Sequence, residues 1–193
     1  MIGAIVLAAG KSARMGQPKM LLPWGKTTVL GAVLETCAAA GIDHVLVVTG
    51  AARESVEAVC REKAASSVFN PAYAEGEMLS SIQAGIRELP AAVEATLVAL
   101  GDQPRMQPQT VVSVAAAYAD SGAQLVVPSY KMHRGHPWLI HQDLWPELLN
   151  LQPGESSRDF LRRHASEIRY VRVDSPTILE DMDTPQDYLK LRP

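Results

Sequence analysis

Short apolar runs alternate along this chain with longer stretches in which apolar residues recur at helical spacing. The runs predict strands, because Val, Ile and Leu follow one another almost without interruption, as in strands buried on both faces. Gly41 and Gly122 stand where two of the helices are expected to end. We therefore expect strands at 2–8, 44–49, 67–69, 96–100 and 124–128, and helices at 29–40, 54–64, 78–88 and 111–120.

This alternation predicts an α/β fold of three layers, in which a mostly parallel sheet is covered by helices on both faces. In sheets of this kind, ligands bind beyond the carboxyl ends of the strands. The loops that follow the strands are therefore the first place to look for functional side chains.

The pattern changes after residue 128. The segments 130–133 and 137–140 flank Arg134-Gly135 and predict a hairpin or small flap that could cover the site, followed by a helix at 144–149. Beyond it we expect a short helix at 159–164, a strand at 168–173, and a last helix that Thr184 caps, with Pro185 at its first position.

The composition is that of an ordinary globular protein, with 193 residues, of which 47% are hydrophobic and 20% are charged. One core suffices at this length, so we expect a single domain over residues 1–193. Cys37 and Cys60 fall in expected helices, and we interpret them as small core residues in a reducing compartment. The apolar run at 2–9 is too short to span a bilayer and has no basic region before it, so we expect no signal peptide, no membrane partner and a cytoplasmic location.

Charge is distributed unevenly along the chain. The first 34 residues carry four basic residues and no acidic one, whereas the rest carries 21 acidic against 14 basic residues. Nucleic acid is not an expected partner, because the sequence pI is about 5.9 and the aromatic content is 5%, neither of which suits a broad basic surface with stacking side chains. A small polyanion suits the basic segment better.

The strongest motif directly follows the first expected strand. Residues 7–16 read Leu-Ala-Ala-Gly-Lys-Ser-Ala-Arg-Met-Gly, and Gln-Pro-Lys follows at 17–19. Glycine and small residues let backbone N–H groups approach a phosphate chain, and Lys11, Arg14 and Lys19 can offset the charge of a nucleoside triphosphate. A Walker A loop is excluded, since Ile5 and Met20 stand where its first glycine is required, and the dinucleotide pattern G-x-G-x-x-G is missing after this strand.

Together with four later blocks, this motif resembles the nucleotidyltransferases that attach a nucleotide to molybdopterin, the MobA-like NTP transferase family, and within it the molybdenum cofactor cytidylyltransferase branch. The blocks read Glu-Gly-Glu-Met-Leu-Ser-Ser at 75–81, Gly-Asp-Gln-Pro at 101–104, Arg-Gly-His-Pro at 134–137 and Asp-Met-Asp-Thr-Pro at 181–185. The resemblance covers nearly the whole chain. It implies a Rossmann-like nucleotidyltransferase fold that binds a nucleoside triphosphate and Mg²⁺, transfers the nucleotidyl group to a phosphate and releases pyrophosphate.

The resemblance also implies roles for individual residues. Arg14, Lys19 and Asp102 are the expected catalytic residues, with the two cations offsetting charge on the reacting triphosphate. CTP or another nucleoside triphosphate is expected to contact the first-strand loop and the start of the helix at 78–88. The expected nucleotide-binding residues are Leu7, Ala8, Ala9, Gly10, Lys11, Ser12, Arg14, Lys19, Gly76, Ser80 and Ser81.

Asp102 and Asp183 are the expected ligands of Mg²⁺. Asp102 follows an apolar run, so its carboxylate should emerge at the carboxyl edge of the sheet, and Mg²⁺ commonly binds one or two carboxylates together with substrate phosphates. Asp183 is assigned because the sugar-activating cytidylyltransferases with a similar Asp-Thr-Pro block bind the metal through this aspartate. A turn role for Asp102 and a capping role for Asp183 are the structural alternatives.

Arg134 and His136, in the expected flap, are interpreted as binding the phosphate of a molybdopterin-type acceptor, with His136 as a hydrogen-bond donor rather than a base. Purely structural roles stay open for His136 and for Ser80 and Ser81, which can cap their helix. Guanylyltransferase relatives typically read Leu-Ala-Gly-Gly where this chain has Ala9 before its glycine, so the Ala9 methyl group is expected to favour cytosine over a purine.

We therefore expect transfer of CMP from CTP to molybdopterin, with a molybdenum hydroxylase as the protein that receives the product. Two alternatives stay open. The enzyme could use another nucleoside triphosphate or another phosphorylated acceptor, or the chain could be a non-catalytic accessory protein that delivers the cofactor to a molybdenum enzyme.

Overall fold

The computed structural model describes residues 1–75, 77–152 and 154–193, and its centre is a sheet with the strand order β10-β7-β9-β6-β1-β4-β5. Strands β1, β4, β5 and β6 run parallel to their neighbours among these four, and β10 runs parallel to β7. The strands of this sheet are β1 (Ile2–Ala8), β4 (His44–Thr49), β5 (Ser66–Phe69), β6 (Ala95–Leu100), β7 (Leu125–Tyr130), β8 (His133–Arg134), β9 (Trp138–His141) and β10 (Arg169–Arg172).

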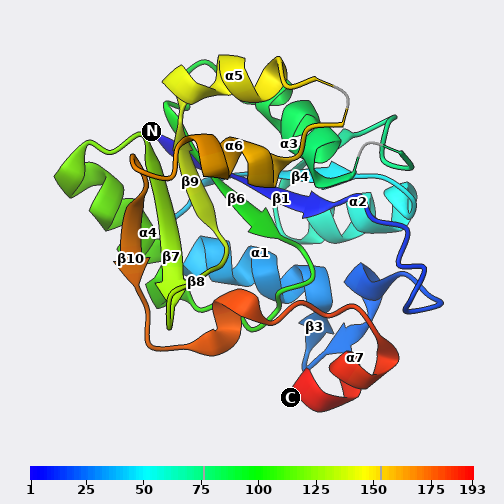
Figure 1. Cartoon of the computed structure of the whole chain (residues 1–193). Coiled ribbons are helices and arrows are strands. Elements are labelled where there is room, and N and C mark those ends of the chain that lie inside the picture. Colours follow the sequence, from blue (N-terminus) through cyan, green and yellow to red (C-terminus); the bar gives the residue numbers. More distant parts are fainter. Residues whose placement is uncertain (76, 153) are drawn as a thin grey trace.

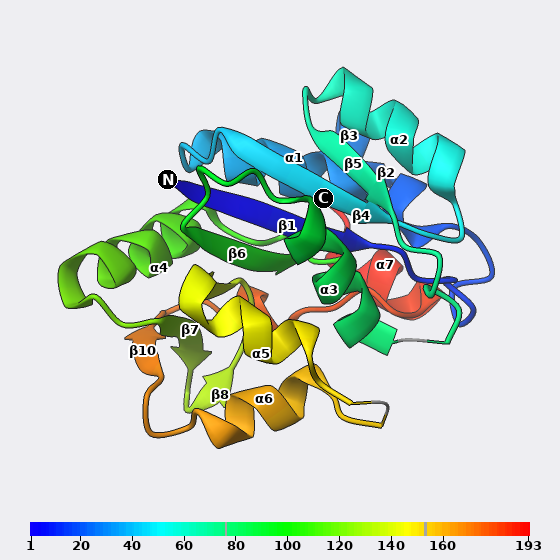
Figure 2. The same cartoon turned by 90° about the horizontal axis from the view of Figure 1, so that it is seen from above.

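Helices cover both faces of the sheet, as the alternating pattern predicts (Figure 1, Figure 2). One face carries α1 (Val29–Ala39), α2 (Arg53–Glu62) and α4 (Pro108–Ser121), and the other carries α3 (Glu77–Glu88), α5 (Trp145–Leu149) and α6 (Ser157–Arg163). The three-layer α/β prediction is confirmed. No helix in the described ranges is long and apolar enough to cross a membrane.

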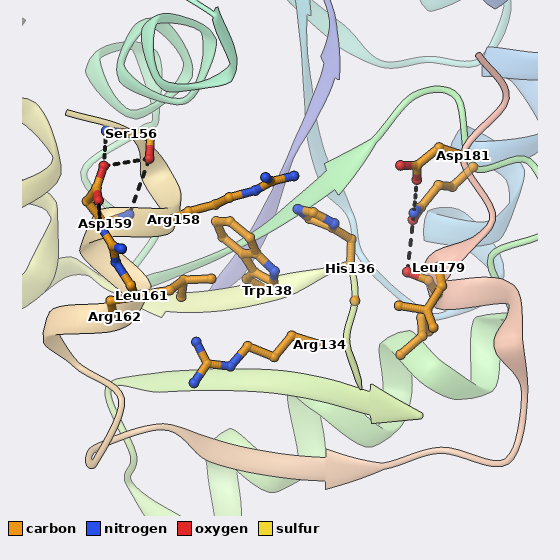
Figure 3. A pocket seen from close by; sticks show the side chains of 13 residues that line it. Arg134, His136, Trp138, Ser156, Arg158, Asp159, Leu161, Arg162, Leu179 and Asp181 are labelled. Atoms are coloured by element: carbon orange, nitrogen blue, oxygen red, sulfur yellow. Dashed lines mark hydrogen bonds and ion pairs between the residues drawn. The ribbon is translucent and has the colours of Figure 1, made fainter. Parts of the chain in front are cut away.

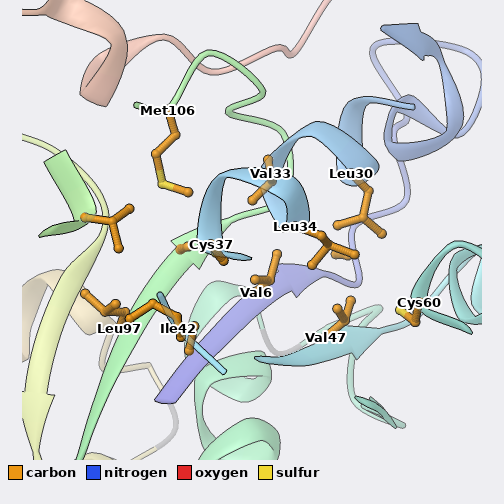
Figure 4. Packing of buried hydrophobic residues seen from close by; sticks show 14 of the residues in the cluster. Val6, Leu30, Val33, Leu34, Cys37, Ile42, Val47, Cys60, Leu97 and Met106 are labelled. Atoms are coloured by element: carbon orange, nitrogen blue, oxygen red, sulfur yellow. The ribbon is translucent and has the colours of Figure 1, made fainter. Parts of the chain in front are cut away.

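Successive side chains of β1 divide the core between the two helical layers. Ala4, Val6 and Ala8 pack with residues of α1, α2 and α4, and Figure 4 shows Val6 facing Val33 and Cys37 of α1. The intervening residues, Ile5 and Leu7 among them, pack with α3, α5 and α6. Because β1 is buried on both faces, its sequence is an unbroken apolar run rather than an alternating one.

Both cysteines belong to the layer that contains α1 and α2, where their thiols are free and buried. Burial raises the pKa of Cys37 to about 12 and, with the nearby charge of Glu57, the pKa of Cys60 to about 11. Both therefore stay protonated at neutral pH, as small core residues do.

The last helix, α7 (Pro185–Leu191), brings the C-terminal segment back to the start of the chain. Thr184 caps it in a reciprocal arrangement with Asp187, and Pro185 occupies its first turn, as predicted. Tyr188 donates a hydrogen bond to the carbonyl of Pro23 over 2.8 Å. This contact joins α7 to the two-stranded ribbon of β2 (Pro23–Trp24) and β3 (Thr27–Thr28), beside which α7 lies in Figure 1.

The segment 137–140 differs from the expected flap. Strand β9 lies inside the sheet, antiparallel to both β6 and β7, and Trp138 to Ile140 are buried. The hairpin is shorter than predicted and pairs Ser129 with Arg134 across β7 and β8. The prediction of a hairpin was wrong in its second strand, because a short apolar run does not reveal which neighbours it pairs with.

His164 joins α6 to α5 at the edge of the second helical layer. Its Nε2 lies 2.7 Å from a carboxylate oxygen of Glu147, and its Nδ1 lies 2.9 Å from one of Glu167. Burial opposes the charged ring, but the hydrogen bonds to Glu167 and Glu147 outweigh it and raise the pKa of His164 above its ordinary value of 6.5. The protonated ring can donate to both carboxylates at once.

We expect His164→Gln to reduce stability at pH 6 more than at pH 9. Since the folded pKa lies above the unfolded value, the His164 contribution is fully present below about pH 6.5 and is lost as pH rises through the folded pKa. Denaturant unfolding of both proteins from pH 5.5 to 9 measures the difference, and His133→Gln, at an exposed position of β8, is the matched control. A difference in unfolding free energy that stays constant with pH would contradict this role.

Candidate active site

The loop after β1 is closed by its own backbone and by one hydroxyl group. The carbonyl of Ser12 accepts the N–H groups of Met15 and Gly16, at 3.0 and 3.1 Å. The Ser12 Oγ accepts the N–H of Lys19 over 3.1 Å. Ser12 itself has a φ of 52°, in the left-handed region. The predicted loop therefore has a defined shape and leaves Lys11 and Arg14 exposed.

Two glycines let the neighbouring loops approach the end of β1. A side chain at Gly50, after β4, would place its Cβ 2.2 Å from the carbonyl oxygen of Ala9. At the end of β6, Gly101 donates its N–H to the carbonyl of Leu7 over 3.0 Å. This close approach puts Asp102, the next residue, beside the first-strand loop, as its position after a buried strand predicts.

The Lys19 ammonium group lies between the two predicted metal ligands. It donates to Oδ2 of Asp102 and, over 2.9 Å, to Oδ1 of Asp183. Arg14 donates to the other oxygen of Asp183 over 2.7 Å. The N–H of Met182 reaches the carbonyl of Asp102 over 3.2 Å and holds the two acidic loops together. Three distant segments thus converge on one charged cluster.

The charges in this cluster stabilise one another. Burial lowers the pKa of Lys19, but Asp102 and Asp183 outweigh that effect and the pKa lies above 10.5. Burial likewise opposes ionisation of Asp183, whereas its bonds to Lys19 and Arg14 bring its pKa below the usual range. Both groups are charged at neutral pH, so the cluster offers two carboxylates and two cations to a ligand.

The donor set suits a divalent cation that shares its coordination with a substrate. In the described residues, no group of three or more His, Cys, Asp and Glu side chains is arranged to hold a metal ion. Two carboxylates completed by phosphate oxygens and water are, however, a common donor set for Mg²⁺. Asp102 and Asp183 therefore fit a metal that arrives with a triphosphate.

Ser80 and Ser81 lie on α3 and share one partner that the sequence did not reveal. The side-chain amide of Asn70 donates to the Ser80 Oγ over 2.9 Å and to the Ser81 Oγ over 3.0 Å. Asn70 is buried directly after β5. Its carboxamide oxygen accepts the N–H of Ala72, which fixes the turn that leads toward α3. Gly76, also predicted to bind the nucleotide, lies outside the described residues.

A cavity of about 580 Å³ opens next to the charged cluster and contains the two predicted acceptor residues (Figure 3). Asp181 lies on one side of it (Figure 3) and accepts a hydrogen bond from the Gln103 amide over 2.6 Å. Arg134 and His136 line the cavity from the β8–β9 segment. The Asp181-Met182-Asp183 block therefore connects the cavity with the Lys19 cluster.

His136 is an uncharged group at neutral pH. Its ring stacks on Trp138 with centroids 4.5 Å apart, and burial together with the charge of Arg158 lowers its pKa to about 3. The Nε2 atom is shielded from solvent and has no hydrogen-bond partner within the described parts of the chain. At this atom the neutral ring can donate or accept one hydrogen bond, depending on its tautomer.

The structure brings together most of the predicted residues. Leu7 and Ala8 end β1, the loop residues 9–14 follow it, and Lys19, Asp102 and Asp183 meet beside this loop. Sequence reasoning missed Asn70, Gln103, Asp181 and Arg158. Gln103 and Asp181 belong to the quoted blocks and could have been named from them, whereas Asn70 and Arg158 stand in no motif.

Comparisons with known proteins find relatives along most of the chain. Residues 4–168 match the MobA-like NTP transferase domain. The molybdenum cofactor cytidylyltransferase of Escherichia coli (strain K12) is 28% identical over 97% of this chain and 94% of that protein. The nicotine blue oxidoreductase of Paenarthrobacter nicotinovorans is 31% identical over 98% of this chain and 96% of that protein.

Solved structures superpose on this chain over nearly its whole length. Rv0371c from Mycobacterium tuberculosis H37Rv superposes with a TM-score of 0.83 and is 30% identical, with 98% of this chain and 96% of that chain covered. A complex of Rv0371c with manganese superposes with a TM-score of 0.79 at 28% identity, over 99% of this chain and 97% of that one. A divalent metal has thus been observed with a relative of this fold.

We expect Lys19→Met to lower kcat/KM for nucleotide-dependent pyrophosphate release by about 100-fold or more. A loss of this size is typical when one preorganised hydrogen-bond donor that stabilises negative charge is removed. Lys26→Met is the matched control, because Lys26 is exposed in the same basic segment, and we expect its loss to stay below about threefold. Steady-state kinetics with Mg²⁺ measures both variants. Equal losses would mean that the segment acts through its overall charge rather than through the Lys19 contacts.

Proposed function

The chain belongs to the MobA-like NTP transferase family, and we propose that it transfers CMP from CTP to a phosphorylated, molybdopterin-type acceptor. Membership of this family means that the chain is a nucleotidyltransferase. The choice of CTP, of the acceptor and of Mg²⁺ is our proposal, as is delivery of the product to a molybdenum hydroxylase.

One observation carries the proposal. Asp183 contacts the Lys19 cluster, and Asp181, two residues earlier, lines the adjoining cavity. A triphosphate bound along the first-strand loop and an acceptor bound in the cavity would therefore meet at this block. The E. coli relative is a molybdenum cofactor cytidylyltransferase, which supports the choice of CTP and acceptor.

In the proposed reaction, an oxygen of the acceptor phosphate attacks the α-phosphorus of CTP, and the bond from this phosphorus to the bridging oxygen of the β-phosphate breaks. Pyrophosphate leaves with that oxygen. The attacking phosphate is already ionised, so the residues are needed to position the groups and to offset negative charge, and no covalent enzyme intermediate is required.

The chain's own residues supply most of this electrostatic work. Lys19 and Arg14 offset charge on the triphosphate, while backbone N–H groups of the loop at 7–12 contact the nucleotide. Asn70 fixes the hydroxyl groups of Ser80 and Ser81; since Ser81 is 5% exposed, Ser80 is the one that would contact the nucleoside. Asp102 and Asp183 would hold Mg²⁺, which when bound polarises the phosphoryl oxygens.

The deciding experiment measures pyrophosphate release with each of the four nucleoside triphosphates, Mg²⁺ or Mn²⁺, and molybdopterin or other phosphorylated acceptors. We expect CTP and molybdopterin to give the highest kcat/KM. Turnover with a different pair would replace the proposed substrates. Binding of molybdopterin without turnover of any nucleotide would favour the accessory-protein alternative.

We expect Asp102→Ala to fold normally and to lose about 100-fold or more of Mg²⁺-dependent transfer, because Asp102 lies at a strand end and serves the metal and Lys19 rather than the core. Circular dichroism and turnover separate the two effects, and Asp120→Ala, at an exposed position of α4, controls for loss of one acid. Retention of most activity by a well-folded Asp102→Ala protein would show that the metal assignment is wrong.

We expect Ala9→Gly to lower the ratio of kcat/KM for CTP to that for GTP by about 5- to 150-fold without inverting it, since one methyl group in a pocket is worth only about 1–3 kcal/mol. Ala9 is 5% exposed and belongs to the hydrophobic cluster that contains Leu79 of α3, while its backbone lies against Gly50. Ala8→Gly removes a methyl group from the opposite face of the strand and should leave the ratio unchanged. An unchanged ratio in Ala9→Gly would place base selection elsewhere.

A further inference from the structure

Lys19 has two sets of partners in the proposed reaction, and its side chain cannot contact both at once. In the structure, its ammonium group donates to Oδ2 of Asp102 and, over 2.9 Å, to Oδ1 of Asp183. In the proposed reaction, the same ammonium group offsets charge on the triphosphate, while Asp102 and Asp183 hold a divalent metal. Lys19 therefore has to move from the carboxylates to the phosphates.

A divalent metal and the ammonium group need the same carboxylate oxygens. A metal that bridges the two aspartates takes an oxygen from each, at about 2.0–2.1 Å for Mg²⁺. Lys19 already bonds to one oxygen of Asp102 and one of Asp183, and Arg14 bonds to the second oxygen of Asp183 over 2.7 Å. An ammonium group has no lone pair with which to join the metal's ligands, and two adjacent cations repel each other. The two cations therefore exclude each other from this carboxylate pair.

The Lys19 side chain can make this movement while its backbone stays in place. The Ser12 Oγ accepts the N–H of Lys19 over 3.1 Å, so the Lys19 backbone is tied to the loop along which the triphosphate would bind. The ammonium group ends a flexible four-carbon stem. The side chain is only 11% exposed, and a buried charge without a partner is costly. Once it leaves the carboxylates, the ammonium group needs another anion or has to turn toward solvent.

We propose that the Lys19 ammonium group is the counterion of Asp102 and Asp183 in the metal-free protein, that a divalent metal displaces it, and that it then bonds to the phosphates of the nucleotide. The second step rests on the proposed function, whereas the exchange at the carboxylates concerns metal binding alone. Because the triphosphate takes up the displaced charge, the metal and the nucleotide each strengthen the binding of the other. Lys19 thus weakens metal binding to the free protein and favours it in the nucleotide complex.

The first test measures Mn²⁺ binding without nucleotide, from the loss of the electron paramagnetic resonance signal of free Mn²⁺. We expect Lys19→Met to tighten Mn²⁺ binding by about 10-fold or more, within the range of about 5- to 150-fold that is typical of coupled sites. Lys26→Met removes an equal charge from an exposed position of the same basic segment and should change the affinity less than about threefold. Affinities of Lys19→Met and Lys26→Met that do not differ would overturn the proposal.

Two further variants keep this measurement decisive. Asp102→Ala should abolish the binding, and Mn²⁺ binding that survives in Asp102→Ala would overturn the proposal, because the metal would then lie elsewhere. Lys19→Gln, which also lacks the charge but retains a hydrogen-bond donor for the carboxylates, replaces Lys19→Met if circular dichroism shows that Lys19→Met does not fold.

The second test follows Lys19 itself in the wild-type protein. Acetic anhydride modifies amines, and mass spectrometry gives the modification rate of each lysine, with Lys26 as the internal reference. An ammonium group that bonds to two carboxylates is protected, so we expect bound Mn²⁺ to raise the rate at Lys19 by about threefold or more and to leave Lys26 unchanged. An unchanged rate at Lys19 with Mn²⁺ bound would overturn the displacement, even if Lys19→Met binds the metal more tightly.

Nucleotides complete the second test. With Mn²⁺ and a nucleoside triphosphate, we expect the modification rate of Lys19 to return to its metal-free value or below, because the ammonium group then bonds to phosphate. All four nucleoside triphosphates are tried, so that a wrong choice of CTP is separated from a wrong role for Lys19. Modification of Lys19 that stays fast with every triphosphate would overturn the second step. If Lys19 behaves as expected but no acceptor is turned over, the proposed function fails and the exchange at the carboxylates stands.

Discussion

The site depends on one ammonium group that is held between two carboxylates. At an effective dielectric constant of 20, two unit charges 4 Å apart interact by about 4 kcal/mol, so Asp102 and Asp183 would repel each other strongly without a cation between them. Lys19 supplies it and bonds to both. The parallel arrangement of β1 and β6 brings the Lys19 loop and Asp102 together, and α7, packed on the β2–β3 ribbon, anchors Asp183. Much of the architecture can therefore be understood as support for this contact.

The sequence predicts the buried parallel strands well because their physics is local. The bounds of β1 and β4 were predicted correctly, since an unbroken run of Val, Ile and Leu is required in a strand with helices on both faces. The insertion of β9 between β6 and β7 could not be predicted in the same way. Three of its four residues, Trp138 to Ile140, are apolar, as in any buried strand. The choice of two antiparallel neighbours depends on how distant segments pack, and the periodicity of the sequence does not show this.

The same distinction applies to the site. Asp102 and the first-strand loop were predictable because the carboxyl ends of neighbouring parallel strands meet at one edge. Lys19 was predicted as a contact of the triphosphate, but its position between two aspartates depends on Met182 reaching the carbonyl of Asp102, a contact between residues 80 positions apart. Arg158 stands in no motif, and only its position in the wall of the cavity marks it as a candidate for ligand contact. The spacing of residues in the sequence cannot identify side chains whose role depends on lining a cavity.

The structure also shows how the charges of the basic segment, the first 34 residues, are arranged. Two of its four cations, Arg14 and Lys19, already contact Asp183, while Lys11 and Lys26 are exposed. The basic segment is thus partly neutralised where chemistry is expected. A triphosphate entering the first-strand loop meets two carboxylates as well as two cations, and that mixture favours a nucleotide that brings a divalent metal with it over a bare anion. Selectivity for a metal-bound nucleotide would follow from the two aspartates as much as from the basic residues around them.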